Sequence, residues 1–384
     1  MKYLVYYDTP ANKKENRNYV LAATNKIDYI CTALNRIGES VALISASESL
    51  GRKCCRGKTV SLSENTILQL FPCLGKGTLP RRVLDRMVLK TSLFLHLLCH
   101  VRRGENLLVY HSLGYTGMVC LLKKLKNFRL ILEVEEIYAD VSGRKKDREK
   151  EFKLFSAADA YVFPTEMLNA TINTQHKPYT LIHGTYQVEA DRGCNVFEKD
   201  MQRKIHCVYA GTFDPRKGGA IAAAAAAEFL PAQYHIHVLG FGSEEQTKRM
   251  QEYIELLAKR CKCGISYDGL LSGEDYIKFL QSCDIGLSTQ NPDAAFNATS
   301  FPSKILSYMA NGLRVVSIRI PAVEGSAVGD YLHYYDEQTP EAIARAIQQV
   351  NWKDGYDGCS LIDRLNIEFQ EELKVLIGDK YAES

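Results

Sequence analysis

The chain has 384 residues, of which 46% are hydrophobic and 24% are charged. This length is more than one hydrophobic core usually holds, and the composition excludes a disordered or low-complexity protein. The formal net charge of +3 hides an asymmetry, because residues 1–150 carry 26 Lys/Arg and 14 Asp/Glu whereas the remainder carries 22 and 31. A basic half joined to an acidic half indicates that one domain meets an anionic partner or surface.

The twelve cysteines are expected to be reduced thiols of a soluble, cytoplasmic protein, since the opening MKYLVYYD is typical of a strand and not of a signal peptide. Their spacing lacks the paired ligand sets of a zinc site, so no metal is expected. No stretch reaches the roughly 20 apolar residues of a membrane span.

Short apolar runs alternate with helical patterns along the first half. The runs lie at 3–7, 41–44, 107–110, 130–134, 159–164 and 179–182, and the helical patterns at 19–36 and 116–125. Strands that alternate with helices predict an α/β fold with a parallel sheet covered by helices on both faces.

The same alternation starts again after a polar stretch at 191–203, which reads as a linker. Strands are predicted at 206–210, 234–239, 265–267, 285–288 and 314–317, and helices from 220 and at 244–259, 276–281, 303–310 and 361–377. We therefore predict two Rossmann-like domains facing across a cleft: residues 1–190, residues 200–355, and a helix within 360–384 that crosses the domain junction. Ligands of such sheets bind beyond the carboxyl ends of the strands.

The strongest chemical signal is FPSKILSYMANGLRVVS at 301–317, which reads as a loop, a short helix, a glycine cap and a strand. Pro302 fixes the chain entry and Ser303 is a candidate N-cap, so free N–H groups and a positive dipole end favour a diphosphate there. A cation in the first helical turn opposes that dipole, which makes Lys304 a candidate ligand contact. The alternative is an exposed lysine without a role.

Two glycine segments, each placed between a strand and a helix, accompany this signal. The first is GTFDPRKGG at 211–219, where glycines allow close backbone approach and Arg216 and Lys217 supply charge. The second is GFG at 240–242. Neither has the spacing of a P-loop, and each alone is a weak signal.

In this order the three segments resemble the donor domain of family 4 retaining glycosyltransferases of the GT-B fold, over about residues 205–320. The segment CDIGLS at 283–288 matches a short strand of that family, and the Phe-Pro-Ser-Lys form resembles members acting in surface-polysaccharide assembly. The resemblance implies metal-independent transfer from a nucleotide sugar, without another cofactor. It places Lys217 and Gly242 at the diphosphate, Lys304 at the sugar or its phosphate, and Leu270 at the base. The further donor-site candidates are Gly211, Thr212, Arg216, Thr299, Phe301, Pro302, Ser303 and Ser307.

The sequence departs from the family pattern at three of these positions. Thr212 stands where the family has a loop arginine, and Thr299 and Ser307 stand at its two glutamates. A serine holds a ribose less firmly than a carboxylate does, which favours the alternative of a binding-only subunit that stabilises a partner transferase.

In the first half, the catalytic candidates are Glu135, Glu136 and His111, which follow predicted strands. One of the two adjacent carboxylates can face a ligand, for acceptor binding or base assistance, and the alternative is a solvated loop edge. His111 is more often structural at such a place. The segment HGT at 183–185 matches the family's turn out of the first domain.

The function predicted from these residues is transfer of a hexose-type residue, with retention, to a saccharide acceptor that can be lipid-linked. The other alternative is a nucleotide-sugar epimerase of similar build, which needs no acceptor.

Basic clusters surround an apolar run in the first half. The run is Leu93–Leu98 within a helix predicted at 87–101, and the clusters lie at 52–58, 81–86, 102–103 and 123–129. The run reads as a buried core helix or as a membrane-contact helix. No nucleic-acid-binding motif accompanies the clusters, so we expect an anionic membrane surface, the inner leaflet, as partner.

Overall fold

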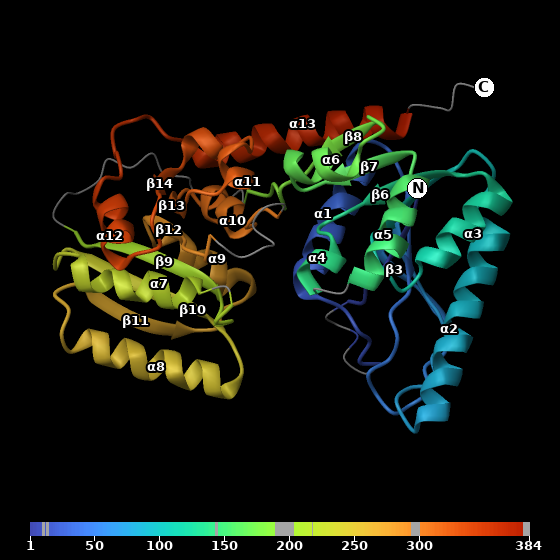
Figure 1. Ribbon diagram of the computed structural model, residues 1–384, viewed down its shortest axis with the longest axis horizontal. Helices are drawn as coiled ribbons and strands as arrows, with labels where there is room; N and C mark the ends of the chain where they lie inside the picture. Colours follow the sequence, from blue (N-terminus) through green and yellow to red (C-terminus); the bar gives the residue numbers. More distant parts are fainter. Residues whose placement is uncertain are drawn as a thin grey trace. The chain divides into compact units, whose positions relative to one another are not determined.

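The computed structural model describes residues 1–9, 12, 15–142, 145–188, 203–216, 218–292 and 300–378. The chain forms two compact units (Figure 1). The first contains Met1–Pro164, Leu168–Ile182 and Ile367–Ser384, and the second contains Thr165–Met167 and His183–Asn366. All but the last residue of the predicted linker at 191–203 lies outside the described residues.

The first unit is built on an eight-stranded sheet of order β3-β4-β2-β1-β5-β6-β7-β8. Every neighbouring pair is parallel except β3 and β4. The strands are β1 Lys2–Val5, β2 Val41–Ser45, β3 Lys58–Ser63, β4 Thr66–Leu70, β5 Asn106–Tyr110, β6 Arg129–Glu133, β7 Ala160–Phe163 and β8 Tyr179–Leu181. The helices are α1 Leu21–Arg36, α2 Leu79–His100, α3 Thr116–Lys126, α4 Tyr138–Ser142, α5 Lys145–Ala157 and α6 Glu166–Ile172.

The predicted apolar runs form the strands β1, β2, β5, β6 and β7 and the edge strand β8 of this sheet. β6 and β7 are buried along their whole length, as expected for strands covered on both faces. The prediction missed the hairpin of β3 and β4, in which β3 alternates between half-buried and exposed residues at the sheet edge.

α2 begins eight residues before the predicted helix and contributes Leu93 and Leu97 to the core. Phe94 and Leu98 pack partly against that core, while Leu95 remains 51% exposed. The Leu93–Leu98 run is therefore mainly part of the core, which favours the interpretation as a buried core helix over that as a membrane-contact helix.

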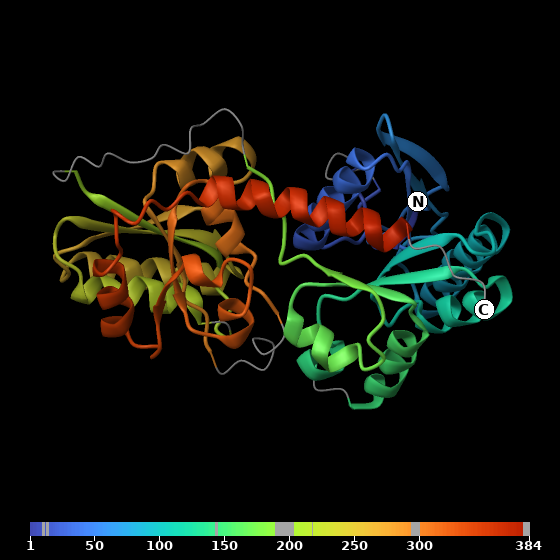
Figure 2. The same ribbon diagram turned by 90° about the horizontal axis from the view of Figure 1, so that it is seen from above.

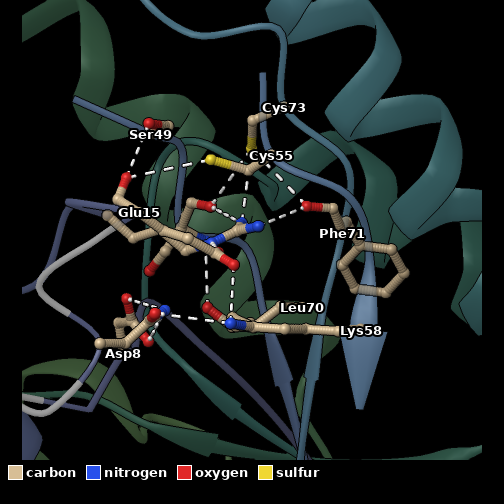
Figure 3. A network of polar contacts seen from close by, with 12 residues as sticks. Asp8, Glu15, Ser49, Cys55, Lys58, Leu70, Phe71 and Cys73 are labelled. Atoms are coloured by element: carbon tan, nitrogen blue, oxygen red, sulfur yellow. Dashed lines mark hydrogen bonds and ion pairs between the residues drawn. The ribbon is translucent and has the colours of Figure 1, made fainter. Parts of the chain in front are cut away.

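A buried arginine fixes the loops that follow β1 and β2. The side chain of Arg17 is fully buried and donates to the backbone oxygens of Ser47 at 3.1 Å and Phe71 at 2.9 Å. Its charge is balanced by Glu15, which also pairs with Lys58 (Figure 3). The network fixes the backbone at Ser47, which lies beyond the carboxyl end of β2.

The second unit has a fully parallel six-stranded sheet of order β11-β10-β9-β12-β13-β14. The strands are β9 Ile205–Thr212, β10 Tyr234–Phe241, β11 Gly264–Gly269, β12 Ile285–Ser288, β13 Arg314–Ile318 and β14 His333–Tyr335. The helices are α7 Gly219–Ala225, α8 Glu244–Ala258, α9 Gly273–Gln281, α10 Lys304–Ala310, α11 Pro321–Glu324 and α12 Pro340–Gln348. This is the Rossmann order 3-2-1-4-5-6, whose direction reverses between β9 and β12. The first unit has the same reversal between β1 and β5.

The last helix, α13 Gly358–Gly378, is one uninterrupted helix (Figure 2), and its residues from Ile367 onward count to the first unit. There Phe369 stacks on Tyr29 with ring centroids 5.9 Å apart, and Glu372 accepts from Thr180 at 2.6 Å. The second half of the helix is thus an integral part of the first unit.

Two further expectations concern cysteines and membranes. Ten of the described cysteines are free thiols, in line with the expectation of reduced thiols. In the part of the chain that the structure describes, no helix is long and apolar enough to cross a membrane.

Candidate functional site

The sheet of the second unit opens at the carboxyl end of β9. This strand pairs with β10 over its whole length, but with β12 only at Cys207 and Val208. Beyond that point the N–H of Ala210 donates instead to the hydroxyl of Tyr308, at 2.8 Å. Tyr308 can lie there because Gly286 has no side chain, since a Cβ at that position would come 2.2 Å from the tyrosine ring. The opening is the switch point at which open α/β sheets bind ligands.

Lys304 lies at this opening. Its Nζ is 4.0 Å from the centre of the Tyr209 ring, and 3.1 Å from the position that a Cβ on Gly211 would occupy. The structure therefore brings together the predicted residues Lys304 and Gly211, from segments about 90 residues apart. Burial raises the pKa of Tyr209, which keeps the ring neutral beneath the ammonium group. Such a cation–π contact contributes about 0.5–2 kcal/mol.

The residues around Lys304 form a packed support. Gly184 lies against Ser303 and Leu306, because a Cβ there would come 3.2 Å and 2.9 Å from their side chains. The ring of His183 packs on Phe301 with centroids 5.0 Å apart, and Pro302 accepts the first backbone bond, from Ile305. Ser303 occupies the N-cap position of α10, but its side chain makes no capping hydrogen bond, contrary to the sequence prediction. The hydroxyl of Ser307 lies 3.5 Å from that of Tyr276.

The glycine segments meet at the ends of β9 and β10. Gly240 has φ +144°, and a Cβ there would lie 1.7 Å from the carbonyl oxygen of Gly211. Two residues later, Gly242 precedes the capping box of α8, formed by Ser243 and Gln246. The backbones of the two strands thus touch in a way that only glycine permits.

The basic residues of the first glycine segment are placed differently from Lys304. Arg216 is exposed, and its guanidinium pairs with the carboxylate of Asp214 at 2.7 Å. Thr212 ends β9, and Leu270 follows β11 with 64% of its surface exposed. Lys217 and Thr299 lie outside the described residues.

In the first unit, the predicted His111 is a buried residue. It is 1% exposed, it stacks on Tyr138 with centroids 4.8 Å apart, and its Nε2 lies 3.2 Å from a carboxylate oxygen of Glu151. Burial lowers the pKa of His111 to about 3, so the ring is neutral at pH 7. This environment favours a structural role over proton transfer.

The adjacent carboxylates Glu135 and Glu136 are both half-buried just beyond β6. Glu135 pairs with Lys26 at 2.5 Å, and the same ammonium donates to the carbonyl oxygen of Ile182 at 3.2 Å. Because the Lys26 ammonium already occupies the carboxylate of Glu135, this residue is a weaker candidate for a base than its sequence position indicated.

Sequence reasoning missed Glu133, the last residue of β6. It is fully buried, accepts a hydrogen bond from the hydroxyl of Tyr3, and has one carboxyl oxygen without a partner in the described structure. Burial, followed by repulsion from Glu135, raises the pKa of Glu133 to about 8. The sequence signal that could have indicated it is a charged residue inside the predicted apolar run 130–134.

Among the described residues, no group of three or more His, Cys, Asp or Glu side chains could hold a metal ion.

Comparison with known proteins identifies the architecture. Residues 204–351 match the family model described as glycosyl transferases group 1. An E. coli structure described as trehalose-6-phosphate bound with UDP-2-fluoro glucose is 10% identical, with a TM-score of 0.68 and full coverage of both chains. Sucrose-phosphate synthase from Thermosynechococcus elongatus is 14% identical, with a TM-score of 0.64 over 98% of this chain and 94% of that one. The chain has the GT-B fold.

The N-terminal domain of trehalose-6-phosphate phosphatase from Candida albicans matches as well, with a TM-score of 0.61, 10% identity and coverage of 98% and 96%. No curated protein sequence matches the chain. The predicted fold class is therefore confirmed. The match to the family model lies within the second unit.

Proposed function

We propose that this GT-B protein is a retaining glycosyltransferase that moves a hexose-type residue from a nucleotide sugar to a saccharide acceptor. The observation that carries the proposal is the position of the Lys304 ammonium beside Gly211, at the open switch point of the second sheet. A cation next to a side-chain-free backbone suits a diphosphate, since the phosphate oxygens can approach both the charge and the peptide N–H groups.

The role of Lys304 in this proposal is to stabilise the charge that develops on the departing diphosphate. A preorganised cation in a packed site lowers the barrier more than a mobile one, because it needs no reorganisation during the reaction. The ring of Tyr209 holds the Lys304 ammonium in place through the cation–π contact. Lys217 is proposed to supply a second cation to the diphosphate. The proposed reaction uses no metal ion.

Retention requires that the acceptor attack from the side of the leaving group, so the departing diphosphate itself can take the acceptor proton. The protein then needs no separate general base. That fits the burial of His111 and the ion pair of Glu135 with Lys26.

Ligand binding is tested first, by a thermal-shift screen against UDP, GDP, ADP and their sugars. A nucleotide at a hundred times its dissociation constant stabilises the protein by about 2.7 kcal/mol. Transfer is then measured with the donor that binds, and the anomeric configuration of the product is read by NMR. Isomerised donor in the absence of acceptor identifies an epimerase instead. Binding of no nucleotide contradicts the proposal.

A binding-only subunit remains the second candidate, on the evidence of Ser307. Its hydroxyl lies near the hydroxyl of Tyr276, so a neutral pair occupies the place of the family's ribose-binding glutamate. This candidate predicts nucleotide binding without donor hydrolysis or transfer. A Ser307→Glu variant that gains activity supports it, whereas a wild-type protein that already turns over excludes it.

The assignment to family 4 and a role in polysaccharide assembly belong to the same proposal, and their support is the Phe-Pro-Ser-Lys segment at 301–304. A cytoplasmic location is proposed with them.

A further inference from the structure

The first unit contains a cavity of about 770 Å³, formed entirely by its own residues. It lies beyond the carboxyl ends of β1, β2 and β5, and therefore at the switch point of the first sheet. Its floor is the stacked pair Tyr6 and Tyr115, with ring centroids 5.3 Å apart. Gly114 permits this floor, because a Cβ there would come 2.3 Å from the Tyr6 hydroxyl.

The side walls of the cavity are apolar and come from two neighbouring helices, α2 and α3 (Figure 1). They are formed by Leu89, Leu93, Phe94, Met118 and Leu121, and Thr91 is the polar residue that lines the cavity beside them. Such walls give the many hydroxyl groups of a free sugar few hydrogen-bond partners, so they disfavour a sugar as their occupant. They suit a hydrocarbon chain instead.

The rim of the same cavity is cationic. Arg86 and Lys90 of α2 and Lys150 of α5 line it, against the single carboxylate of Glu48. All three cations are exposed, and Arg86 and Lys90 form no ion pair within the described residues. The Lys150 ammonium donates to the carbonyl oxygen of Leu113 at 2.7 Å, which holds it near the rim. An anion is therefore the expected polar partner.

The apolar walls continue outside the cavity along both helices. Val83 and Met87 precede Lys90 and Phe94 on one side of α2, and Leu125 follows Leu121 by one turn of α3. The side chains of Val83, Met87 and Leu125 are 51%, 60% and 58% exposed. A hydrocarbon chain longer than the cavity thus finds further exposed apolar side chains beside it on both helices.

We propose that this cavity binds a single anionic lipid phosphate, with the phosphate among Arg86, Lys90 and Lys150 and the hydrocarbon chain against the walls of α2 and α3. The unpaired cations match the phosphate of such a molecule, and the apolar walls match its hydrocarbon chain. As a statement about the acceptor, the inference rests on the proposed function: the lipid phosphate is the carrier of the saccharide that receives the sugar.

Gly117 offers a specific test, because a Cβ there meets no atom within 4 Å and the residue lines the cavity from α3. A Gly117→Phe variant is designed to place its ring in the cavity, since the Cβ has room, and Gly117→Ala is its matched control. The probe is decyl phosphate below its critical micelle concentration, measured by calorimetry with the full chain. Decyl maltoside, inorganic phosphate and glucose 6-phosphate are the comparison ligands.

The wild type and Gly117→Ala are expected to bind decyl phosphate at least tenfold more tightly than any comparison ligand, and Gly117→Phe is expected to lose at least tenfold. Lys90→Glu should weaken binding similarly, whereas Lys124→Glu on the exposed surface of α3 should not. Unchanged binding by a folded Gly117→Phe protein overturns the proposal, as does equal affinity for glucose 6-phosphate.

Two further measurements separate this proposal from its alternatives. Gly117→Phe should bind vesicles of phosphatidylcholine with phosphatidylglycerol less well than the wild type does. If the wild type and Gly117→Phe sediment equally with these vesicles, the anionic lipid binds the outer surface of the protein, and the cavity site is overturned. UDP and GDP binding should be the same in Gly117→Phe and wild type. Lipid binding without nucleotide binding contradicts the proposed function and leaves the cavity site standing.

Discussion

The ammonium group of Lys304 lies over the ring of Tyr209, with Nζ 4.0 Å from the ring centre, and both residues border Gly211. This contact explains how a lysine is accommodated as the first residue of α10, where it opposes the helix dipole. The ring attracts the cation and compensates for the unfavourable dipole, so the charge is held at the strand end.

Replacing Lys304 should therefore reduce turnover far more than stability. Because the loss of the cation–π contact and the relief of the dipole largely cancel, Lys304→Gln should change the free energy of unfolding by less than about 1 kcal/mol. Transfer should fall by at least a hundredfold, about 2.7 kcal/mol of transition-state stabilisation. Urea unfolding and initial rates measure both quantities, and Lys304→Arg serves as the charge-conserving control. A variant that unfolds, or that keeps full activity, contradicts this role.

Lys217 and Arg216 should differ in their effect on nucleotide binding, although they are neighbours. Lys217 is expected to contact the diphosphate, so Lys217→Ala should weaken UDP or GDP binding more than tenfold. Arg216 is exposed and already paired with Asp214, so Arg216→Ala should change the affinity less than threefold, in line with the small worth of exposed ion pairs. Isothermal titration distinguishes the two variants. The same loss in both would show that the loop acts through its total charge.

Most strands of both sheets could be predicted, because a buried parallel strand is a continuous apolar run that can be recognised from the local sequence alone. The prediction missed the hairpin of β3 and β4 and the short edge strand β14. The alternating Ser and Thr residues of β3 form a strand only because they pair with β4 at the sheet edge. The prediction of Lys304 came from a local conflict with helix rules, which is visible without a structure. The contact of Lys304 with Tyr209 could not be predicted from the sequence. A tyrosine within an apolar strand gives no indication of which side chain will pack on its ring.

The environment of Glu133 and the cavity in the first unit could not be predicted either, because both depend on contacts between segments that are distant in the sequence. Glu133 ends a strand that was predicted, but its burial depends on Tyr3 from another strand. The cavity depends on the spacing of α2 and α3, which no pattern in either helix encodes. Pattern reasoning therefore found elements and backbone-dependent glycines better than it found side-chain environments.

Gly240 should be among the least replaceable residues of the second unit. An alanine Cβ would lie 1.7 Å from the carbonyl oxygen of Gly211, so β9 and β10 would have to separate at their carboxyl ends. Together with the positive φ, this should destabilise the protein by about 3 kcal/mol or more. Gly117→Ala is the control, since its Cβ meets open space within a helix and should stabilise by up to about 1 kcal/mol. Chemical denaturation compares the two, and a Gly240→Ala protein as stable as wild type would refute the close approach.

A cluster of three histidines in the second sheet should make stability sensitive to acid. His206, His235 and His237 lie on one face of β9 and β10, with ring centroids of His235 and His237 4.2 Å apart. Burial, then repulsion from His237 and His206, lowers the pKa of His235 to about 4, and burial and His237 lower that of His206. The acidic groups facing the cluster are Asp268, 3.1 Å from His237, and Asp284, and the nearby cations are Arg203 and Lys204.

The sign of the effect follows from the lowered pKa. Between about pH 6.5, the ordinary histidine value, and pH 4, the unfolded chain binds protons at His235 that the folded chain does not, so the free energy of unfolding falls as the pH drops. Urea unfolding at pH 7 and pH 5 should show this loss, and His235→Gln should reduce it because the protonatable ring is gone. His176→Asn is the matched control, as His176 is exposed with φ +51°, which asparagine tolerates. If His235→Gln loses as much stability between the two pH values as the wild type and the control do, the cluster does not set the acid sensitivity.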